Sequence, residues 1–528
     1  MRLLSGGLTA ALTVSLVGCA AGSSASSSAG SLDNVVVAVG ALPDSLTPAP
    51  WGGSASHVVL SGLGSQLLEY KTDASGGQSC PATSVGVSGR LAESVEPTAD
   101  GTGVVVALRS LTSQFGNTLS AEDVRWSLEI GMKRQPVMAG TLKSSGFNVD
   151  DLVKVIDPRT VQLNTTGMNS FTVESLQNNL FYIHDSTEAK KHVTADDPTA
   201  NNWLSKNLAD YSGWDLEEFS PGTSLTVTAD PDWGGERGAV RRVVVKAVPN
   251  TATRSQLVES GEVQVGNGFD YDQYKSLEGA PGVAVINCPS QTRDTMMFNT
   301  KTGPLAEEKV RQAISMAIDR EALVKGAYAG YGEAAGSIFP MVEGSASYKF
   351  DTEGAKKLLA EAGYANGFPL TLTYSTTRPG PVAAKSSVLI QSMLKEIGID
   401  VELKNVASTT DFSTALLDGR YQAALYAEPI VIADPAFYSY AFYVTGAPSN
   451  STGWSDSEFD KTRIELAATP LDEAEKRTDL LNKMTSRVDA GAPILSLVET
   501  RGMLVAKEGL PGAAPLTNGQ IYFNALGR

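Results

Sequence analysis

The sequence predicts a two-lobed α/β protein whose first part is rich in β-structure. From residue 34 to about residue 250, short apolar runs separated by turn residues are typical of strands. After Asn299, segments of helical periodicity alternate with short strands, which indicates an α/β lobe with a partly parallel sheet. From about Leu495 the pattern returns to strands, so we infer that the chain re-enters its first lobe. The two crossings, near residues 288–299 and 495–501, would form a hinge beside a cleft.

In the first part, the expected strands are short runs of mainly β-branched residues between turns. One helix start is clearly marked, because Ser120 and Asp123 have the spacing of a capping box ahead of an apolar run. The strands are expected at residues 35–39, 104–108, 160–163, 225–228 and 242–248.

In the second part, helices are predicted from apolar residues that recur at i, i+3, i+4 and i+7. Pro304 precedes the first of them, and Gly363 and Gly398 are placed to end the next two. Strands are expected at residues 370–374 and 399–403. The apolar positions are Val310, Ala313, Ile314, Ala317 and Ile318 in the first helix, and Ala355, Leu358, Leu359 and Ala362 in the second.

The N-terminus reads as an export signal. Arg2 is followed by an apolar stretch that is too short for a bilayer span of about 20 residues and ends in a lipobox at Cys19. We expect cleavage before Cys19 and its lipidation, which would anchor the protein to the outer face of the cytoplasmic membrane. An ordinary signal peptide with a chance cysteine is the alternative.

These patterns divide the chain into a leader, a tether and two lobes. The expected organisation is a signal peptide at residues 1–18, a lipidated, Ser-rich tether at 19–31, lobe I at 32–290 plus 499–528 with an extra subdomain at about 70–200, and lobe II at 291–498.

Composition narrows the function classes. Of 528 residues, 42% are hydrophobic and 19% are charged, as in folded soluble proteins, which excludes bulk disorder and a polytopic membrane protein. The formal net charge of −16 argues against nucleic acid as a partner, because a polyphosphate needs a basic surface.

Motifs for catalysis are scarce. The sequence has no Gly-x-Ser-x-Gly elbow, Gly-Lys-Ser/Thr phosphate loop or His-Glu-x-x-His. Ser392 and Lys395 match one motif of penicillin-binding enzymes, but the motifs of that set occur in the wrong order here. His184, Glu188 and His192 would share one face if they were helical and could then hold a metal, although a solvated polar face is the simpler interpretation.

Two body cysteines, Cys80 and Cys288, are exported and can form a disulfide, with two unpaired thiols as the alternative. Closing a loop of this size would add roughly 4 to 5 kcal/mol in the chain-entropy model.

Five segments resemble the extracytoplasmic solute-binding protein family 5, the dipeptide- and oligopeptide-binding lipoproteins of peptide/nickel ABC importers. This resemblance implies a type II periplasmic-binding-protein fold of the large cluster, with an extra β-rich subdomain and hinge closure. It implies a monomer without cofactor or metal that acts with an ABC permease and its ATPase and is not an enzyme. The segments are residues 41–49, 91–110, 119–129, 298–324 and 355–372.

The resemblance also suggests ligand contacts. Arg378 is similar in position to the arginine that binds the α-carboxylate in dipeptide binders. Residues 421–435 resemble the family segment that ends in Asp434-Pro435, but Val431 stands where dipeptide binders carry the aspartate that holds the ammonium group. We expect Glu428 to supply that charge, and Asp434, Tyr438 and Trp51 to lie near the ligand.

The leading hypothesis is therefore a receptor for peptides or peptide-like solutes. The loss of the aspartate at Val431 keeps a second binder open, for a metal chelate, an opine-like conjugate or an oligosaccharide. A surface-anchored enzyme and a sensor on the same scaffold are further alternatives.

Overall fold

The computed structural model describes residues 33–48, 54–71, 80, 86–339, 348–377, 379–428, 432, 434–447, 449–515 and 521–528. Four of the residues with expected roles, Cys19, Trp51, Arg378 and Val431, lie outside these ranges. Within these ranges, no helix combines the length and apolar character needed to cross a membrane.

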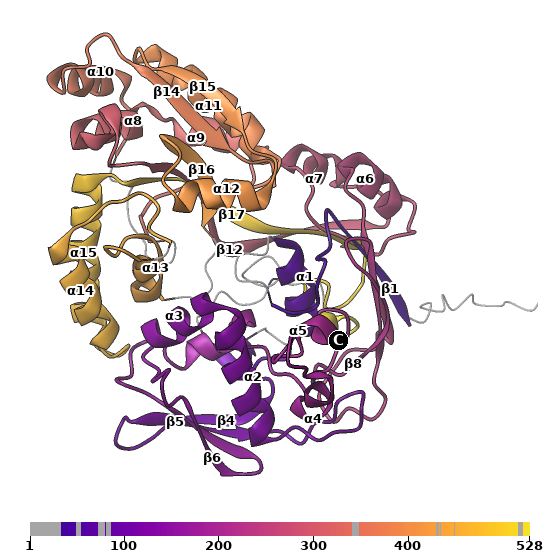
Figure 1. The fold of residues 1–528 in the computed structure, drawn as a ribbon. Helices are drawn as coiled ribbons and strands as arrows, with labels where there is room; N and C mark the ends of the chain where they lie inside the picture. The colour runs from indigo at the N-terminus through magenta and orange to yellow at the C-terminus, as the bar shows by residue number, and fades with distance from the viewer. Residues whose placement is uncertain are drawn as a thin grey trace, which may run out of the picture.

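A mixed sheet of eleven strands runs through the centre of the described chain (Figure 1). The expected strands at residues 35–39, 225–228, 242–248, 370–374 and 399–403 belong to it, whereas those at 104–108 and 160–163 lie in a separate four-stranded sheet. β14 pairs in parallel with β15 and β16, which confirms the partly parallel sheet of the second lobe. The order is β15 (Asp400–Asn405), β14 (Pro369–Tyr374), β16 (Ala423–Glu428), β12 (Val283–Phe298), β17 (Ile494–Lys507), β11 (Val265–Gly266), β1 (Asn34–Val39), β10 (Arg242–Ala247), β9 (Ser224–Ala229) and β8 (Trp214–Ser220), with β13 (Glu333–Ala334) beside β17.

The long antiparallel strands β12 and β17 belong to both halves of this sheet. Residues 283–289 of β12 pair with residues 501–507 of β17 next to β11 and β1, and residues 293–297 pair with residues 494–499 next to β16. The register shifts between the two stretches, after Pro289. Both expected crossings therefore lie side by side in one paired ribbon, and the strand pattern that begins near Leu495 is one long strand.

Lobe II packs helices on both faces of β14, β16 and β12. Alternate residues of β12 point to opposite faces, with Met296 and Phe298 in one core and Met297 in the other. The helices on the first face are α8 (Glu308–Ala317), α9 (Arg320–Gly326), α10 (Thr352–Glu361) and α11 (Val382–Glu396), and those on the second are α12 (Thr409–Leu417), α13 (Pro435–Phe442), α14 (Ser457–Ala468) and α15 (Ala474–Gly491).

The expected helix positions agree with these cores. Val310, Ala313, Ile314 and Ala317 are all buried on α8. Gly363 and Gly398 follow α10 and α11 at φ +87° and +86°, a conformation that residues with a Cβ rarely adopt.

The strands of lobe I pack with α1 (Ser54–Leu63), α6 (Thr251–Glu259) and α7 (Tyr271–Leu277). In this half the sulfur atoms of Cys80 and Cys288 are bonded, joining residues 208 apart in sequence.

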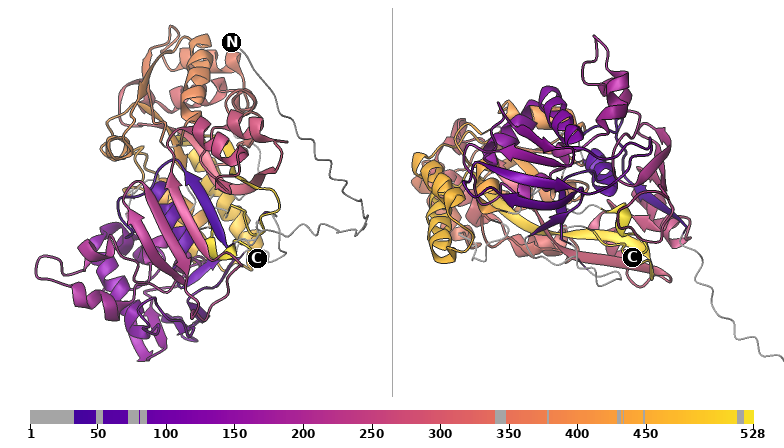
Figure 2. Two further views of the ribbon diagram at one scale, coloured as in Figure 1. Left: turned by 90° about the vertical axis from the view of Figure 1, so that its right-hand side faces the viewer. Right: turned by 90° about the horizontal axis from the view of Figure 1, so that it is seen from below.

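A separate four-stranded sheet has its own core, which includes side chains from Leu67 to Tyr211. We call this part the small subdomain. The capping box starts α2, where Asp123 accepts a hydrogen bond from the backbone N–H of Ser120 at 2.8 Å. In the left view of Figure 2, this subdomain and the orange helices of lobe II lie at opposite ends of the molecule. Its elements are β4 (Ala92–Pro97), β5 (Gly103–Leu108), β7 (Thr160–Asn164), β6 (Val153–Asp157), α2 (Ala121–Arg134) and α3 (Pro136–Ser144).

Candidate functional site

A row of three charged residues crosses neighbouring strands where the two halves of the sheet meet. Arg293 on β12 lies opposite Glu428 on β16 and opposite Glu499 on β17. Residues that are directly opposite in a sheet share one face, so the three side chains lie in one line. Arg293 is fully buried, and its Nη2 lies 2.9 Å from Oε1 of Glu499.

The arginine is held from several sides. Nη1 of Arg293 donates to Oγ of Ser496 and to the carbonyl oxygen of Ser337, both at 2.7 Å. Burial opposes its charge, but Tyr438 and the two glutamates outweigh burial and raise the pKa of Arg293. The pKa of Glu499 is raised by burial, and the charge of Arg293 partly offsets this rise. The row therefore carries a permanently charged arginine between two acids.

Glu428 and Tyr438, both expected near a ligand, are in contact with each other. The Tyr438 hydroxyl donates to the Glu428 carboxylate, and both side chains are buried. The Tyr438 ring centroid also lies 5.6 Å from Cζ of Arg293, within cation–π range. Burial, followed by the charge of Glu428, raises the pKa of Tyr438. Glu428 thus lies opposite an arginine on the next strand, and its expected role toward an ammonium group stays a prediction.

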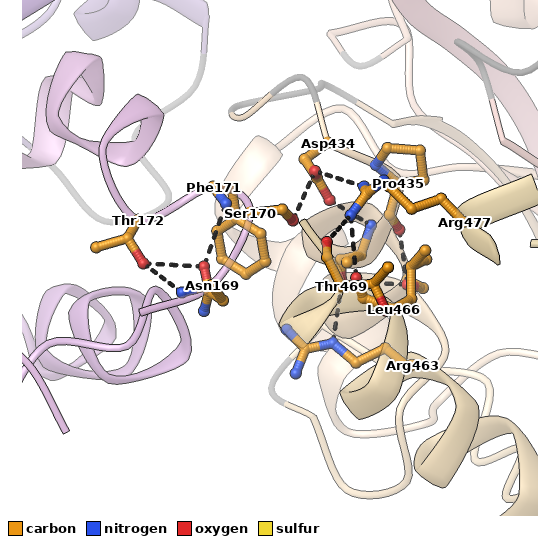
Figure 3. Close-up of polar contacts among 12 residues, drawn as sticks. Asn169, Ser170, Phe171, Thr172, Asp434, Pro435, Arg463, Leu466, Thr469 and Arg477 are labelled. Atoms are coloured by element: carbon orange, nitrogen blue, oxygen red, sulfur yellow. Dashed lines mark hydrogen bonds and ion pairs between the residues drawn. The ribbon is translucent and has the colours of Figure 1, made fainter. Parts of the chain in front are cut away.

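Asp434 caps the helix that follows this segment. Its Oδ1 accepts from the backbone N–H of Ala436 at 2.7 Å, at the start of α13. Its Oδ2 accepts from Oγ of Ser170 at 2.8 Å and lies 3.1 Å from Nη2 of Arg477 (Figure 3). Asp434 therefore holds three separate segments together, and a ligand role for it stays a prediction.

The opposite face of β12 carries an acid beside the same hinge. Oη of Tyr328 donates to Oδ2 of Asp294 at 2.6 Å. Burial, partly offset by this hydrogen bond, raises the pKa of Asp294 to about 7. The Tyr328 ring lies 5.0 Å, between centroids, from that of Tyr271 on α7, so lobe I and lobe II meet here too.

The possible metal face is not formed. Between His184 and His192, the α-helix covers only residues 186–189. His184 itself is buried and forms a β-bridge with Asp210. Burial lowers the pKa of His184 to about 3. His192 contacts Glu188 at 3.3 Å. Among the described residues, no three or more histidines, cysteines or acids are grouped to hold a metal ion.

Other predicted positions are also placed. Ser392 and Lys395 are both exposed on α11, as expected for a solvent-facing helix surface. Sequence reasoning missed Arg293 and Glu499. The signal was available, because Arg293 and Asp294 are the charged residues of this strand and stand just before the apolar run Met296–Phe298, and a buried charge needs partners.

The described chain is a two-lobed α/β fold with a separate small subdomain. The family model of the bacterial extracellular solute-binding proteins, family 5, middle region, matches residues 86–450. The chain therefore belongs to family 5 of the bacterial extracellular solute-binding proteins.

Known proteins resemble it over nearly the whole chain. The probable D,D-dipeptide-binding periplasmic protein DdpA of Escherichia coli K12 is 26% identical over 488 residues, which is 90% of each chain. The periplasmic binding protein DppA of Helicobacter pylori, in complex with the peptide STSA, superposes with a TM-score of 0.79 at 21% identity over 93% of this chain and 97% of that one. AgaA of A. tumefaciens R10, in complex with agropinic acid, superposes with a TM-score of 0.77 at 21% identity, over 93% of this chain and 96% of that one. These two structures share the fold.

Proposed function

We propose that this protein captures peptides or peptide-like solutes outside the cell and passes them to an ABC permease without changing them covalently. The observation that carries the proposal is the similarity to a probable D,D-dipeptide-binding protein over 90% of both chains. Family 5 membership supports the coarser statement that the chain is a substrate-binding component of an ABC importer.

The local chemistry supports a peptide-like solute with no free ammonium group. By the resemblance to the family segment, Val431 stands where dipeptide binders carry the ammonium-binding aspartate. The neighbouring acid, Glu428, already faces Arg293 and accepts from Tyr438. Because a buried ammonium without a carboxylate partner costs several kcal/mol, we favour peptides whose amino end is modified or neutral.

The second candidate, an opine-like conjugate, is favoured by the same observation. Such a solute keeps carboxylates for an arginine such as Arg378 but offers no ordinary peptide amino terminus. The position of Glu428 opposite Arg293 suits this class as well.

Mass spectrometry of the solute released from protein purified from its native cells tests both candidates. Calorimetry then compares free dipeptides, N-acetylated dipeptides and opines with the full-length protein. Recovery of a peptide or modified peptide that rebinds supports the first proposal. An opine-like ligand, with no binding across the peptide panels, rejects it in favour of the second.

We also propose that Cys19 carries the lipid anchor and that residues 19–31 tether the body to the outer face of the membrane. Labelling of cells with a radioactive fatty acid should mark the wild-type protein and not Cys19→Ser. A labelled Cys19→Ser variant would reject the anchor.

A further inference from the structure

A short segment of the small subdomain reaches across to lobe II. It lies between β7 and the next 3₁₀ turn and comprises residues 169–172 (Figure 3). The backbone N–H of Ser170 donates to the carbonyl oxygen of Ala467 at 2.9 Å, at the end of α14. Its hydroxyl donates to Asp434 at the start of α13. One residue thus bonds two helices of the other lobe.

The next residue, Phe171, is buried in the core of lobe II. None of its surface is exposed, and it clusters with residues of β12, β16 and α12–α15. Its ring meets that of Phe437 edge to face, with centroids 5.4 Å apart. Cζ of Arg463 lies 5.8 Å from the Phe171 ring centroid. The Phe171 side chain, which comes from the small subdomain, therefore completes the core of lobe II.

The segment is fixed to the small subdomain on its own side. The hydroxyl of Thr172 donates to the carbonyl oxygen of Ser145 at 2.7 Å and accepts from the backbone N–H of Asn169 at 2.8 Å. The side-chain amide of Asn169 donates through Nδ2 to the carbonyl oxygen of Ser144 at 2.9 Å. Because these bonds tie the segment to the end of α3, it moves with that subdomain.

On the lobe II side, the helices that contact Ser170 and Phe171 are held together by two arginines. Arg477 on α15 pairs with Asp434 and donates through Nη1 to the carbonyl oxygens of Leu466 at 3.0 Å and Thr469 at 2.8 Å. Nε of Arg463 donates to the carbonyl oxygen of Ala436 at 3.0 Å. These two arginines hold α13, α14 and α15 in one arrangement in which Ser170 and Phe171 fit.

We propose that Ser170 and Phe171 form a latch that holds the small subdomain against lobe II and so sets how long a captured solute is retained. The retention step rests on the proposed function. The covalent connections between the halves are β12 and β17, so a movement of lobe II about them has to break the latch contacts. Asp434 also caps α13 at the end of the segment that resembles the ligand-binding segment of the family. The latch therefore couples the lobe contact to that segment.

The test uses the full-length protein with Ser170→Ala and Phe171→Ala, first without any solute. Two matched controls lie inside the small subdomain. Ser113→Ala removes a similar serine–aspartate hydrogen bond, to Asp185, and Phe181→Ala opens a similar hole in the subdomain core. Hydrogen exchange of the Ser170 amide and small-angle X-ray scattering report on the contact and on overall opening.

We expect amide exchange around residue 170 to become about tenfold faster in both latch variants, with a larger radius of gyration. The controls should lower thermal stability without either change. If Phe171→Ala fails to fold, Phe171→Leu keeps an apolar side chain but loses the aromatic pair and should still open the contact. Latch variants that keep wild-type exchange and size would overturn the proposal.

Retention is then measured by off-rates of the tightest-binding members of the free and N-acetylated dipeptide panels. Dissociation should be about tenfold faster in the latch variants, while association changes little. Unchanged off-rates despite an opened contact would overturn the retention role. If no dipeptide of either panel binds the wild type, the dipeptide form of the proposed function is rejected, whereas the solute-free measurements still decide the latch.

Discussion

Arg293 and Glu428 lie directly opposite each other on neighbouring strands, both buried on the same face of the central sheet. Glu499 extends this pair to a third strand that also spans both halves of the molecule. Charges buried in this way are costly unless each has a partner, so the row links the two strands of the hinge to the lobe II sheet by electrostatics as well as by the backbone.

Replacing Arg293 should be strongly destabilising. Arg293→Met leaves the buried Glu428 and the half-buried Glu499 without their cation, and we expect a loss of about 3 to 5 kcal/mol in the free energy of unfolding, measured in urea. Arg420→Ala, which breaks an exposed pair with Asp418, should change it by less than about 0.5 kcal/mol. Adding Glu428→Gln to Arg293→Met should recover part of the loss, and a purely additive double variant would argue against the row.

Stability should fall with rising pH because of Asp294. Its pKa is raised to about 7 in the folded protein, whereas an unfolded aspartate titrates near its ordinary value of about 3.9. Between these values the folded state binds the extra proton, so stabilisation is complete below about pH 4 and is lost as pH rises toward 7. The gap between these two pKa values corresponds to about 4 kcal/mol of stability between low and high pH.

The Asp294→Asn variant isolates this contribution. Its stability relative to the wild type should improve from pH 5 to pH 8, as measured by thermal unfolding at each pH. Asp418→Asn, at an exposed site, serves as the control and should show no such trend. The same pH profile in wild type and Asp294→Asn would contradict the prediction.

Loss of the bond between Cys80 and Cys288 should lower stability. In the chain-entropy model, opening a loop of this length costs about 4 to 5 kcal/mol. Cys288→Ser should therefore unfold at lower denaturant concentration than the wild type, and a reducing agent should shift the wild type but not the variant. Free thiols at both positions in the oxidised, unfolded wild type would show that the bond does not form.

Arg378 should contribute to binding of a solute that carries a carboxylate. For Arg378→Ala we expect affinity to fall by about 10- to 100-fold, the usual effect of losing charge-assisted hydrogen bonds in a desolvated site. Calorimetry with the solute recovered from native protein measures this, and Lys404→Ala, an exposed position on β15, is the control. Equal affinity of Arg378→Ala and wild type would remove Arg378 from the site.

Local features of the fold were readable from the sequence because their causes lie within a few residues. The capping box at Ser120 and Asp123 and the glycines after α10 and α11 depend on neighbouring backbone groups and on φ. Residues 494–507 were harder. The sequence predicts strands from about Leu495, but only the pairing with β12 shows that these residues form one long strand.

The candidate site was only partly predictable. Glu428, Asp434 and Tyr438 were named from one continuous segment, yet their partners Arg293, Arg477 and Ser170 come from distant parts of the chain. His184 and His192 show the reverse case, since a shared helix face requires a helix that the chain does not form there. The predicted lobe boundaries stay predictions.

By itself, the sequence determined the α/β class, many of the strands and helices and the family, since periodicity, turn residues and family segments are local properties. Only the tertiary structure decided that Arg293 lies between two glutamates and that Phe171 is buried in lobe II. The physical reason is that strand register and packing bring together residues more than a hundred positions apart, and no short stretch of sequence records which of them will meet.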